Sequence, residues 1–341
     1  RRWPSLARPG WIVTTSEMPA LLLIDTNVLG IGSMRQYRYR DLSHGGMATG
    51  AILGIVEKLA ELVASHPGHV PIALWDDRCR WREALLPRYK RHRWETPEQV
   101  AFLESYLRQV EIARELLRHL GFPQVFCPGF EADDIVGVIC RRADPSWLIK
   151  LATTDSDWLQ AVRANVEWYS VATGRIVTHT DLGDPDLVAG GPFASVDHFI
   201  QAKALAGDPS DGIPGVDGVG IKTAARIIRD HGSVEALWAK HDAGDPIKGV
   251  ILQRAAGHEY RSAYRRNLQM IDWRLAPPVG TDVEADAGNT DRAAASRVCD
   301  LWGIPAAAVR GLQLSPEVAQ PLVDSVREML SDCGSGSDPR P

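Results

Sequence analysis

Three aspartates of the sequence stand where chemistry with a cation would need them. Asp25, Asp76 and Asp155 each come at or just after the end of a short apolar run (ALLLI, VPIALW and WLIKLA). Such runs predict buried strands, and the carboxyl ends of parallel strands meet at one edge of a sheet, where ligands bind. A single aspartate of this kind is more often a helix N-cap or a turn residue. Three of them favour a common site.

Two local clusters add further carboxylates. Glu131, Asp133 and Asp134 fall in the first turn of a predicted helix, and Asp157 stands two residues after Asp155. One or two acidic residues in a first turn are ordinary partners of the helix dipole, but three in four residues repel one another unless a cation intervenes. In an extended chain the i, i+2 pair would point both carboxylates the same way. Oxygen ligands without His or Cys suit Mg²⁺ or Mn²⁺.

A glycine-rich segment further along the chain could hold a phosphate backbone. It reads GDPSDGIPGVDGVGIKTAARII and contains Asp208, Asp211 and Lys222. Glycines allow the backbone to approach a phosphate closely, and the start of a helix presents free N–H donors. The pattern resembles the helix-hairpin-helix that binds DNA without reading its sequence. The structural alternative is a tight turn between packed helices.

A basic stretch directly follows Asp76. Residues 78–93 contain seven Lys or Arg and one Glu, with Trp81 and Tyr89 between them. A charge run is usually a solvated face. Beside a cation site, however, Lys and Arg can neutralise a phosphodiester, and an aromatic ring can stack on a base.

The order of the strands and helices expected around these residues predicts an α/β fold with a mostly parallel sheet. Strand-like runs alternate with helical patterns at 51–66, 97–120 and 129–142, and 166–170 predicts one more strand. We expect a PIN-like catalytic domain at 20–192 and a helix-hairpin-helix domain at 193–275. A helical extension would follow at 276–330, with 276–290 as a loop. Residues 1–19 and 331–341 read as a disordered leader and tail.

Composition excludes several classes of protein. The chain has 341 residues, 45% of them hydrophobic, and a formal net charge of −5. This mix is that of a soluble globular protein, not of a collagen-like, disordered or disulfide-scaffold chain, and the net charge gives no hint of nucleic-acid binding. Five scattered cysteines without a CxxC pair favour a reducing compartment such as the cytoplasm. No apolar run is long enough for a membrane span.

Taken together, these strings resemble the flap endonuclease and 5′–3′ exonuclease family, which includes the nuclease domain of bacterial DNA polymerase I and stand-alone phage enzymes. The matching strings cover roughly residues 20–275 in the family's order: LLLIDTN, WDD…WREALLPRYKRHR, GFEADDIVG, TTDSDWLQ and KALAGDPSDGIPGVDGVGIKTAARII. The resemblance assigns four acidic residues to one metal site, with Asp134 close by: Asp25, Asp76, Glu131 and Asp133. It assigns four others to a second site: Asp155, Asp157, Asp208 and Asp211.

The resemblance also implies roles for basic residues. Tyr89, Lys90 and Arg93 match a group at the base of a helical arch (about 82–120), where Lys90 and Arg93 would contact the phosphate being cut, and Arg82 matches a further arginine. The helix at 97–120 would form the arch through which a single-stranded 5′ end passes. The segment 216–223 matches the hairpin that holds the duplex, with K⁺ on its backbone carbonyls; the residues concerned are Val216, Gly218, Val219, Gly220, Lys222 and Thr223.

One position departs from the family pattern. Family members carry an arginine about seven residues beyond the first aspartate, near the substrate gateway, and this chain has Gly32 there. Arg35 is the nearest candidate. Either Arg35 substitutes for that arginine or the contact is absent.

The implied activity is that of a structure-specific 5′-nuclease in replication or repair. Two Mg²⁺ ions, replaceable by Mn²⁺ and roughly 4 Å apart, would serve hydrolysis of flap, nicked or 5′-ended DNA, and RNA/DNA hybrids could also be cut. The protein would be a monomer that acts alone or with a separate DNA polymerase. Two alternatives stay open: a non-catalytic module that binds DNA structures, and a ribonuclease of the same fold that removes RNA primers.

Overall fold

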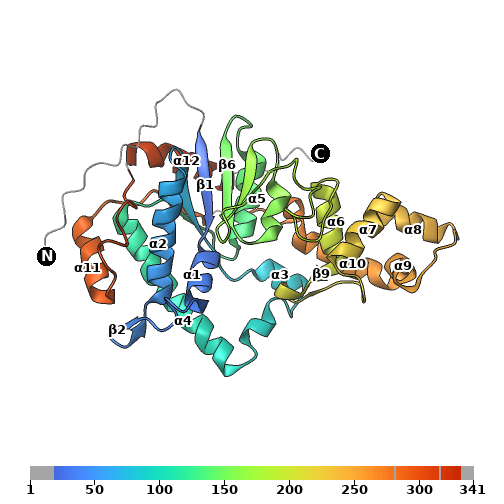
Figure 1. The fold of residues 1–341 in the computed structure, drawn as a ribbon, viewed down its shortest axis with the longest axis horizontal. Coiled ribbons are helices and arrows are strands. Elements are labelled where there is room, and N and C mark those ends of the chain that lie inside the picture. The colour runs from blue at the N-terminus through green and yellow to red at the C-terminus, as the bar shows by residue number, and fades with distance from the viewer. Residues whose placement is uncertain (1–18, 280–281, 315, 332–341) are drawn as a thin grey trace. The chain divides into compact units, whose positions relative to one another are not determined.

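The computed structural model describes residues 19–279, 282–314 and 316–331, which form two compact units (Figure 1). The first unit contains residues 19–78, 94–155 and 279–331, and the second contains residues 79–93 and 156–278. The predicted leader and tail lie almost wholly outside the described residues. The four domain boundaries expected from the sequence stay a prediction.

A mostly parallel sheet forms the centre of the first unit. Within this unit the strand order is β11-β5-β4-β1-β6. β1 (Ala20–Asp25) pairs in parallel with β4 (Val70–Trp75) and β6 (Leu148–Thr153), and β4 pairs in parallel with β5 (Gln124–Phe126). Leu21 is the register partner of both Val70 and Ile149. The α/β fold class expected from the alternation of runs is confirmed.

The central strands are buried because their residues are apolar throughout. Leu21, Leu22, Leu23 and Ile24 in β1 have no exposed surface, and all six residues of β4 are buried. Each such side chain contributes about 1.5–3 kcal/mol of hydrophobic stabilisation. Strands that are covered on both faces need an unbroken apolar run rather than an alternating one, which explains why the runs were visible in the sequence.

Helices of the first unit cover both sides of these strands. In Figure 1, α2 and α5 lie on opposite sides of β1 and β6. Packing joins α1 to α2, α2 to α4, α4 to α11, and α5 to α12. The bounds are α1 Thr26–Arg35, α2 Gly50–Ser65, α4 Pro97–Leu120, α5 Ala132–Arg142, α11 Arg292–Trp302 and α12 Pro316–Ser331; β2 (Ser43–His44) and β3 (Met47–Ala48) form a small hairpin.

Two sequence-based expectations in this unit need correction. The helix expected from Gly129 begins at Ala132, because Gly129 has a positive φ of 83° and Glu131 has extended backbone at the N-cap position. The segment 276–290 is not only a loop, since it contains β11 (Glu284–Asp286), which pairs antiparallel with β5. A three-residue strand at the edge of a sheet carries too little pattern to stand out in a polar segment.

The second unit is mainly helical and has its own apolar core. In this core α6 packs on α7 and α10, and α10 packs on α3. The helices are α3 Arg80–Leu85, α6 Val196–Ala206, α7 Ile221–His231, α8 Val234–Asp242, α9 Val250–Ala256 and α10 His258–Ile271. Short elements complete it: η2 Ser156–Ala161, β7 Val166–Ser170, β8 Ile176–Val177, β9 Gly207–Asp208, η3 Pro209–Asp211, β10 Ile213–Pro214 and η4 Trp273–Leu275. The 3₁₀ helix η1 (Arg91–Trp94) lies at a joint between the units.

The glycine-rich segment forms a tight turn in front of α7. β9 and β10 pair antiparallel, and Gly207 has a positive φ of 73°. A Cβ on Gly215 would lie 2.0 Å from the carbonyl oxygen of Ala206, so only glycine fits there. No side chain caps the start of α7 at Gly220. The helix expected at the end of this segment is present as α7, and the role predicted for residues 216–223 stays a prediction.

Candidate functional site

Asp25 is fixed at the end of β1 by two neutral donors. Its Oδ1 accepts a hydrogen bond from the backbone N–H of Val28 at 3.1 Å, which caps α1. Its Oδ2 accepts from the Thr153 hydroxyl at the end of β6, at 2.8 Å. The same hydroxyl oxygen accepts from the backbone N–H of Asp155 at 2.9 Å. Thr153 therefore links Asp25 to the backbone of Asp155 at the carboxyl edge of the sheet.

Asp76 joins this edge to the start of α5. Its Oδ1 accepts from the backbone N–H of Ala132 at 2.7 Å, and its Oδ2 accepts from the side-chain amide of Asn27. Asn27 stands two residues after Asp25, and Ala132 directly follows Glu131. Hydrogen bonds thus connect the chain segments that carry the first, second and third predicted ligands.

The acidic cluster at the start of α5 is mostly buried. Glu131 and Asp134 have 5% and 2% of their surface exposed, whereas Asp133 is half-buried. The backbone N–H of Glu131 donates to Asp134 Oδ2 at 3.1 Å. Burying carboxylates costs free energy unless donors or a cation compensate, so an oxygen-rich set at this edge fits a divalent cation of the Mg²⁺ type.

Tyr106 and Asn27 belong to the same site and were missed in the sequence. The Tyr106 hydroxyl, from α4, donates to Asn27 Oδ1, and the Asn27 amide donates to Asp76. Burial and the charges of Asp76 and Asp25 raise the pKa of Tyr106 well above its ordinary value. Asn27 lies within the quoted LLLIDTN string, but its amide carries no charge. Tyr106 looks like an ordinary core residue of an amphipathic helix.

In the second unit, an ammonium group joins two predicted metal ligands. Lys203 Nζ lies 2.6 Å from Asp157 Oδ1 and 2.6 Å from Asp208 Oδ2. Burial alone would lower the pKa of Lys203, but the two carboxylates raise it above its ordinary value. Burial raises the pKa of Asp157, against the opposing effect of Lys203. Lys203 stands in the quoted KALAGD string, where nothing marked it as a partner of these acids.

Burial would also raise the pKa of Asp208, yet the contacts of this carboxylate lower it. Lys203 and two hydrogen bonds from Ser210 favour the charged form. Ser210 donates to Asp208 Oδ1 through its backbone N–H at 2.8 Å and through its hydroxyl at 2.5 Å. Asp208 is therefore held as a carboxylate.

Asp157 does not have the extended geometry expected of the Asp155–Asp157 pair. Ser156 begins the 3₁₀ helix η2, so the chain turns between the two aspartates, and they belong to different units. The argument that an extended chain aligns both carboxylates is wrong here. Their assignment to a common metal site stays a prediction.

Asp211 binds the basic residues that were predicted to contact phosphate. Its carboxylate accepts from the Tyr89 hydroxyl at 3.1 Å and from Arg93 Nη2 at 3.0 Å, and Lys90 Nζ lies 3.6 Å away. Lys90 has a left-handed backbone with φ of 51°, which is uncommon for a residue with a side chain. Its backbone N–H donates to the carbonyl oxygen of Asp211 at 2.8 Å. These contacts place Tyr89, Lys90 and Arg93 around one acid of the second predicted metal site.

Two further arginines differ in environment. Arg82 is buried and donates to the carbonyl oxygen of Met270 at 3.0 Å, with its guanidinium 4.4 Å from the Trp81 ring centroid. Arg35 is exposed at the end of α1, with its guanidinium 5.9 Å from the ring centroid of Phe102 in α4. Arg82 thus connects α3 to α10, and the DNA contacts expected of both arginines stay predictions.

Within the hairpin segment at 216–223, two valines are buried and anchor the turn, whereas the residues at the start of α7 are accessible to a ligand. Val216 and Val219 are each 4% exposed, and the Val219 N–H donates to the carbonyl oxygen of Val216 at 2.9 Å. Gly218 has a positive φ of 80°. Gly220 and Lys222 are exposed, and Thr223 is half-buried in the first turn of α7. A backbone phosphate could approach the free N–H groups of that turn.

Among the described residues, no helix has the length and apolar content that a membrane span requires.

Comparison with known proteins agrees with the geometry. Residues 20–185 match the family model of the 5′–3′ exonuclease N-terminal resolvase-like domain, and residues 194–282 match that of the 5′–3′ exonuclease C-terminal SAM fold. DNA polymerase I of Mycobacterium tuberculosis is 32% identical over 236 residues, which are 68% of this chain and 25% of that protein. The chain thus matches about a quarter of the length of these polymerase relatives. A 5′–3′ exonuclease of the same organism is 34% identical over 212 residues, 58% of this chain and 66% of that protein.

Solved structures share the fold. The structure of the bacteriophage T5 5′-exonuclease with divalent metal ions (zinc) has a TM-score of 0.61 and 23% sequence identity, and the match covers 91% of this chain and 99% of that chain. Another structure of the phage protein, described as a flap endonuclease, contains DNA and metal ions. Two adjoining domain models, full-length similarity of fold and the carboxylates at the sheet edge agree: this chain belongs to the 5′–3′ exonuclease family.

Proposed function

We propose that this protein is a structure-specific 5′-nuclease that hydrolyses phosphodiester bonds of flap, nicked or 5′-ended DNA with Mg²⁺. The observation that carries this proposal is the hydrogen-bonded convergence of Asp25, Asp76 and the acidic start of α5 at the carboxyl edge of the sheet. Open α/β sheets bind ligands at this edge. Family membership supports nuclease activity on DNA.

The first-unit carboxylates would hold the cation. Asp25, Asp76, Glu131 and Asp133 are the ligands we favour, with Asp134 beside them. When bound, a divalent ion supplies Lewis-acid polarisation of a phosphate and activation of water. The chain's own contribution is geometric: hydrogen bonds from Thr153, Asn27 and the Ala132 N–H orient Asp25 and Asp76.

The second-unit residues would balance charge around the substrate. We propose that Asp157, Asp208 and Asp211 complete a second cation position together with Asp155. In the structure Lys203 forms ion pairs with Asp157 and Asp208. Lys90 and Arg93 form ion pairs with Asp211. Lys90 and Arg93 would leave Asp211 to offset the charge that grows on the phosphate. The hairpin at 216–223, with K⁺ on its carbonyls, would hold the duplex backbone.

The deciding experiment is the double variant Asp155→Asn/Asp157→Asn, assayed on labelled 5′-flap, nicked and blunt substrates in DNA and RNA versions. We expect duplex binding to survive while cleavage with Mg²⁺ disappears, as it should in the unsubstituted protein with EDTA. The matched control is Asp144→Asn/Asp184→Asn, because each of these aspartates accepts a backbone N–H two residues on at 2.8 Å and lies at the surface. Retained cleavage in the first double variant would remove both residues from the metal site. Faster cleavage of RNA than of DNA would favour the ribonuclease alternative.

A further inference from the structure

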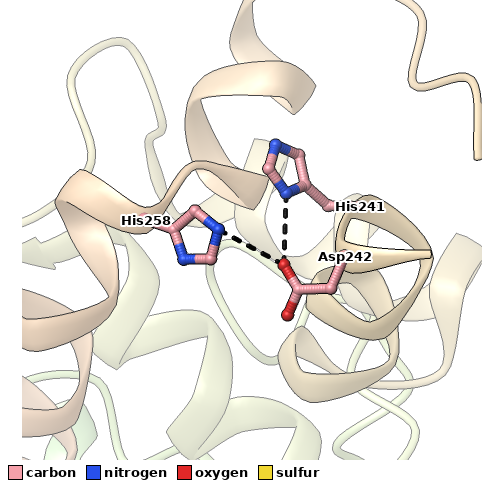
Figure 2. A group of neighbouring side chains, drawn as sticks. All are labelled: His241, Asp242 and His258. Carbon is pink, nitrogen blue, oxygen red and sulfur yellow. Dashed lines mark hydrogen bonds and ion pairs between the residues drawn. The ribbon is translucent and has the colours of Figure 1, made fainter. Parts of the chain in front are cut away.

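A second kind of ligand cluster lies in the helical part of the second unit. His241 and Asp242 end α8, and His258 begins α10. Figure 2 shows both imidazole rings turned toward the same carboxylate oxygen. His241 Nδ1 and His258 Nε2 each lie 3.4 Å from Asp242 Oδ1. All three ligand atoms lie within 4.8 Å of one another.

These distances resemble those of a tetrahedral metal site. Zinc binds His nitrogen and carboxylate oxygen at about 2.0–2.2 Å, so neighbouring ligand atoms stand about 3.3 Å apart. Both of the distances to Asp242 Oδ1 already have this value within 0.1 Å. The two nitrogens lie within 4.8 Å of each other, and the His258 side chain, which is 73% exposed, can rotate to adjust this separation.

The ligand types select a different ion from that of the carboxylate site. Two imidazoles and one carboxylate suit Zn²⁺ and related ions such as Co²⁺ or Ni²⁺, whereas Mg²⁺ prefers oxygen ligands and retains its waters. The Asp242 side chain is 46% exposed and that of His241 is 35% exposed, so water can complete the coordination. Because the two sites prefer different ions, an experiment can distinguish metal binding at this cluster from metal binding at the carboxylate site.

Arg261 would compete with a metal ion for Asp242, and it also helps to orient the Asp242 carboxylate. Its guanidinium donates to Asp242 Oδ2 at 2.8 Å and to Oδ1 at 2.7 Å. It also donates to the carbonyl oxygen of Ala256 at 3.1 Å and lies 5.1 Å from the Trp238 ring centroid, so its position does not depend on Asp242 alone. The hydrogen bonds from Arg261 hold the pKa of Asp242 well below its usual range. Arg261 Nη2 also lies 3.5 Å from His241 Nδ1, so a metal would have to displace Nη2 from Oδ1, while Nη1 can keep Oδ2 and orient the carboxylate.

We propose that His241, Asp242 and His258 bind one zinc-class ion, which fastens the end of α8 to the start of α10. The site would be structural, because it joins two helices that are otherwise connected through α9. It is independent of the proposed nuclease chemistry and takes a different class of ion.

The test is a zinc titration of the full chain by calorimetry, with millimolar Mg²⁺ present to occupy oxygen sites. It is run in the Asp155→Asn/Asp157→Asn background, so that zinc binding at those carboxylates is weakened. We expect one zinc per chain with micromolar or tighter affinity. The double variant His241→Gln/His258→Gln should weaken that affinity at least 30-fold, whereas His179→Gln, at another exposed histidine, should leave it unchanged.

A Co²⁺ titration gives a second readout, since tetrahedral Co²⁺ has visible absorption that octahedral Co²⁺ largely lacks. The band should appear with the parent chain and disappear with His241→Gln/His258→Gln, while circular dichroism shows that the variant is folded. Zinc isotherms that are the same with and without the two histidines would overturn the proposal, as would absence of zinc binding in the presence of Mg²⁺. Loss of nuclease activity in Asp155→Asn/Asp157→Asn bears only on the proposed function.

Discussion

The two units hold their acidic residues in different ways. In the first unit, Asp25 and Asp76 accept hydrogen bonds from backbone N–H groups, a hydroxyl and an amide. In the second unit, Asp157, Asp208 and Asp211 contact ammonium and guanidinium groups. Neutral donors orient a carboxylate and leave its charge, whereas internal cations neutralise it. The hydrogen bonds in the first unit orient Asp25 and Asp76, whereas a metal ion at the second cluster would have to displace Lys203, Lys90 or Arg93.

The largest expected effect tests the first unit. Asp25→Asn should keep the cap of α1, because Asn caps helices as well as Asp does, yet it removes a charged ligand. A lost metal interaction worth several kcal/mol corresponds to a decrease in cleavage rate of about 10²–10³-fold or more. Single-turnover cleavage of a 5′-flap at saturating Mg²⁺ measures it, with Asp144→Asn as control. A rate within threefold of the parent would show that Asp25 does not bind the cation.

The second prediction concerns the internal ammonium. Lys203→Met leaves Asp157 and Asp208 without their shared counter-ion, and removing one partner of a buried ion pair costs roughly 3–5 kcal/mol. The metal-free variant should therefore unfold at a clearly lower temperature. Because Mn²⁺ can replace the ammonium, it should raise the melting temperature of Lys203→Met more than that of the parent chain.

The exposed Lys240 provides the matched control for this comparison. Lys240→Met should change neither the melting temperature nor its response to Mn²⁺. If Mn²⁺ stabilises Lys203→Met and the parent equally, the second-unit carboxylates do not bind metal in competition with Lys203.

A smaller effect is expected from the neutral network of the first unit. Tyr106→Phe removes the hydroxyl that donates to Asn27 and leaves a half-buried amide oxygen without that donor. The free energy of unfolding should fall by about 1–3 kcal/mol in urea titrations. Tyr37→Phe is the control, since Tyr37 is 84% exposed. An unchanged unfolding free energy for Tyr106→Phe would mean that this hydrogen bond does not help to fix the site.

The smallest effect depends on pH. The pKa of Asp208 is lower in the folded chain than in an unfolded one, so its contribution is present above about pH 4 and is lost as pH falls through the folded-state pKa. Ser210→Ala removes a donor to Asp208 and should cost roughly 1 kcal/mol at pH 7. The difference from the parent chain should shrink toward zero as pH falls through the folded-state pKa of Asp208. Urea unfolding at several pH values measures it, and a difference that is independent of pH would contradict the role assigned to Ser210.

Much of the fold was predictable because its central strands are buried on both faces. Apolar runs such as 70–75 then mark a strand without ambiguity, and the helix at 97–120 was predicted with the bounds that the structure shows. Strand ends located Asp25 and Asp76 for the same reason. Charged ligands could be found by type and spacing, but the residues that orient them could not. Thr153 and Asn27 are common residue types whose roles arise only from tertiary contacts.

The local geometry around Asp155, Asp157 and Lys203 could not be predicted from the sequence either. The alternation argument for Asp155 and Asp157 assumed an extended chain, but hydrogen bonding in η2 decides the backbone there. The pairing of Lys203 with two acids depends on η2 meeting α6 and β9, which no periodicity in the sequence reports. The ends of predicted strands locate acidic residues correctly where the backbone is regular. They do not predict side-chain directions once the chain turns, as it does after Asp155.

The division of the chain has a further consequence for how the protein can be cut. The second unit consists of two separate insertions, so the backbone passes between the units at four joints, after residues 78, 93, 155 and 278. Asp155 is itself the last residue before one joint, and Asp76 stands two residues before another. A single proteolytic nick therefore cannot release either unit, and an expressed fragment that ends near residue 155 would lose Asp157, Asp208 and Asp211 together. Studies that truncate this chain should keep all four joints intact.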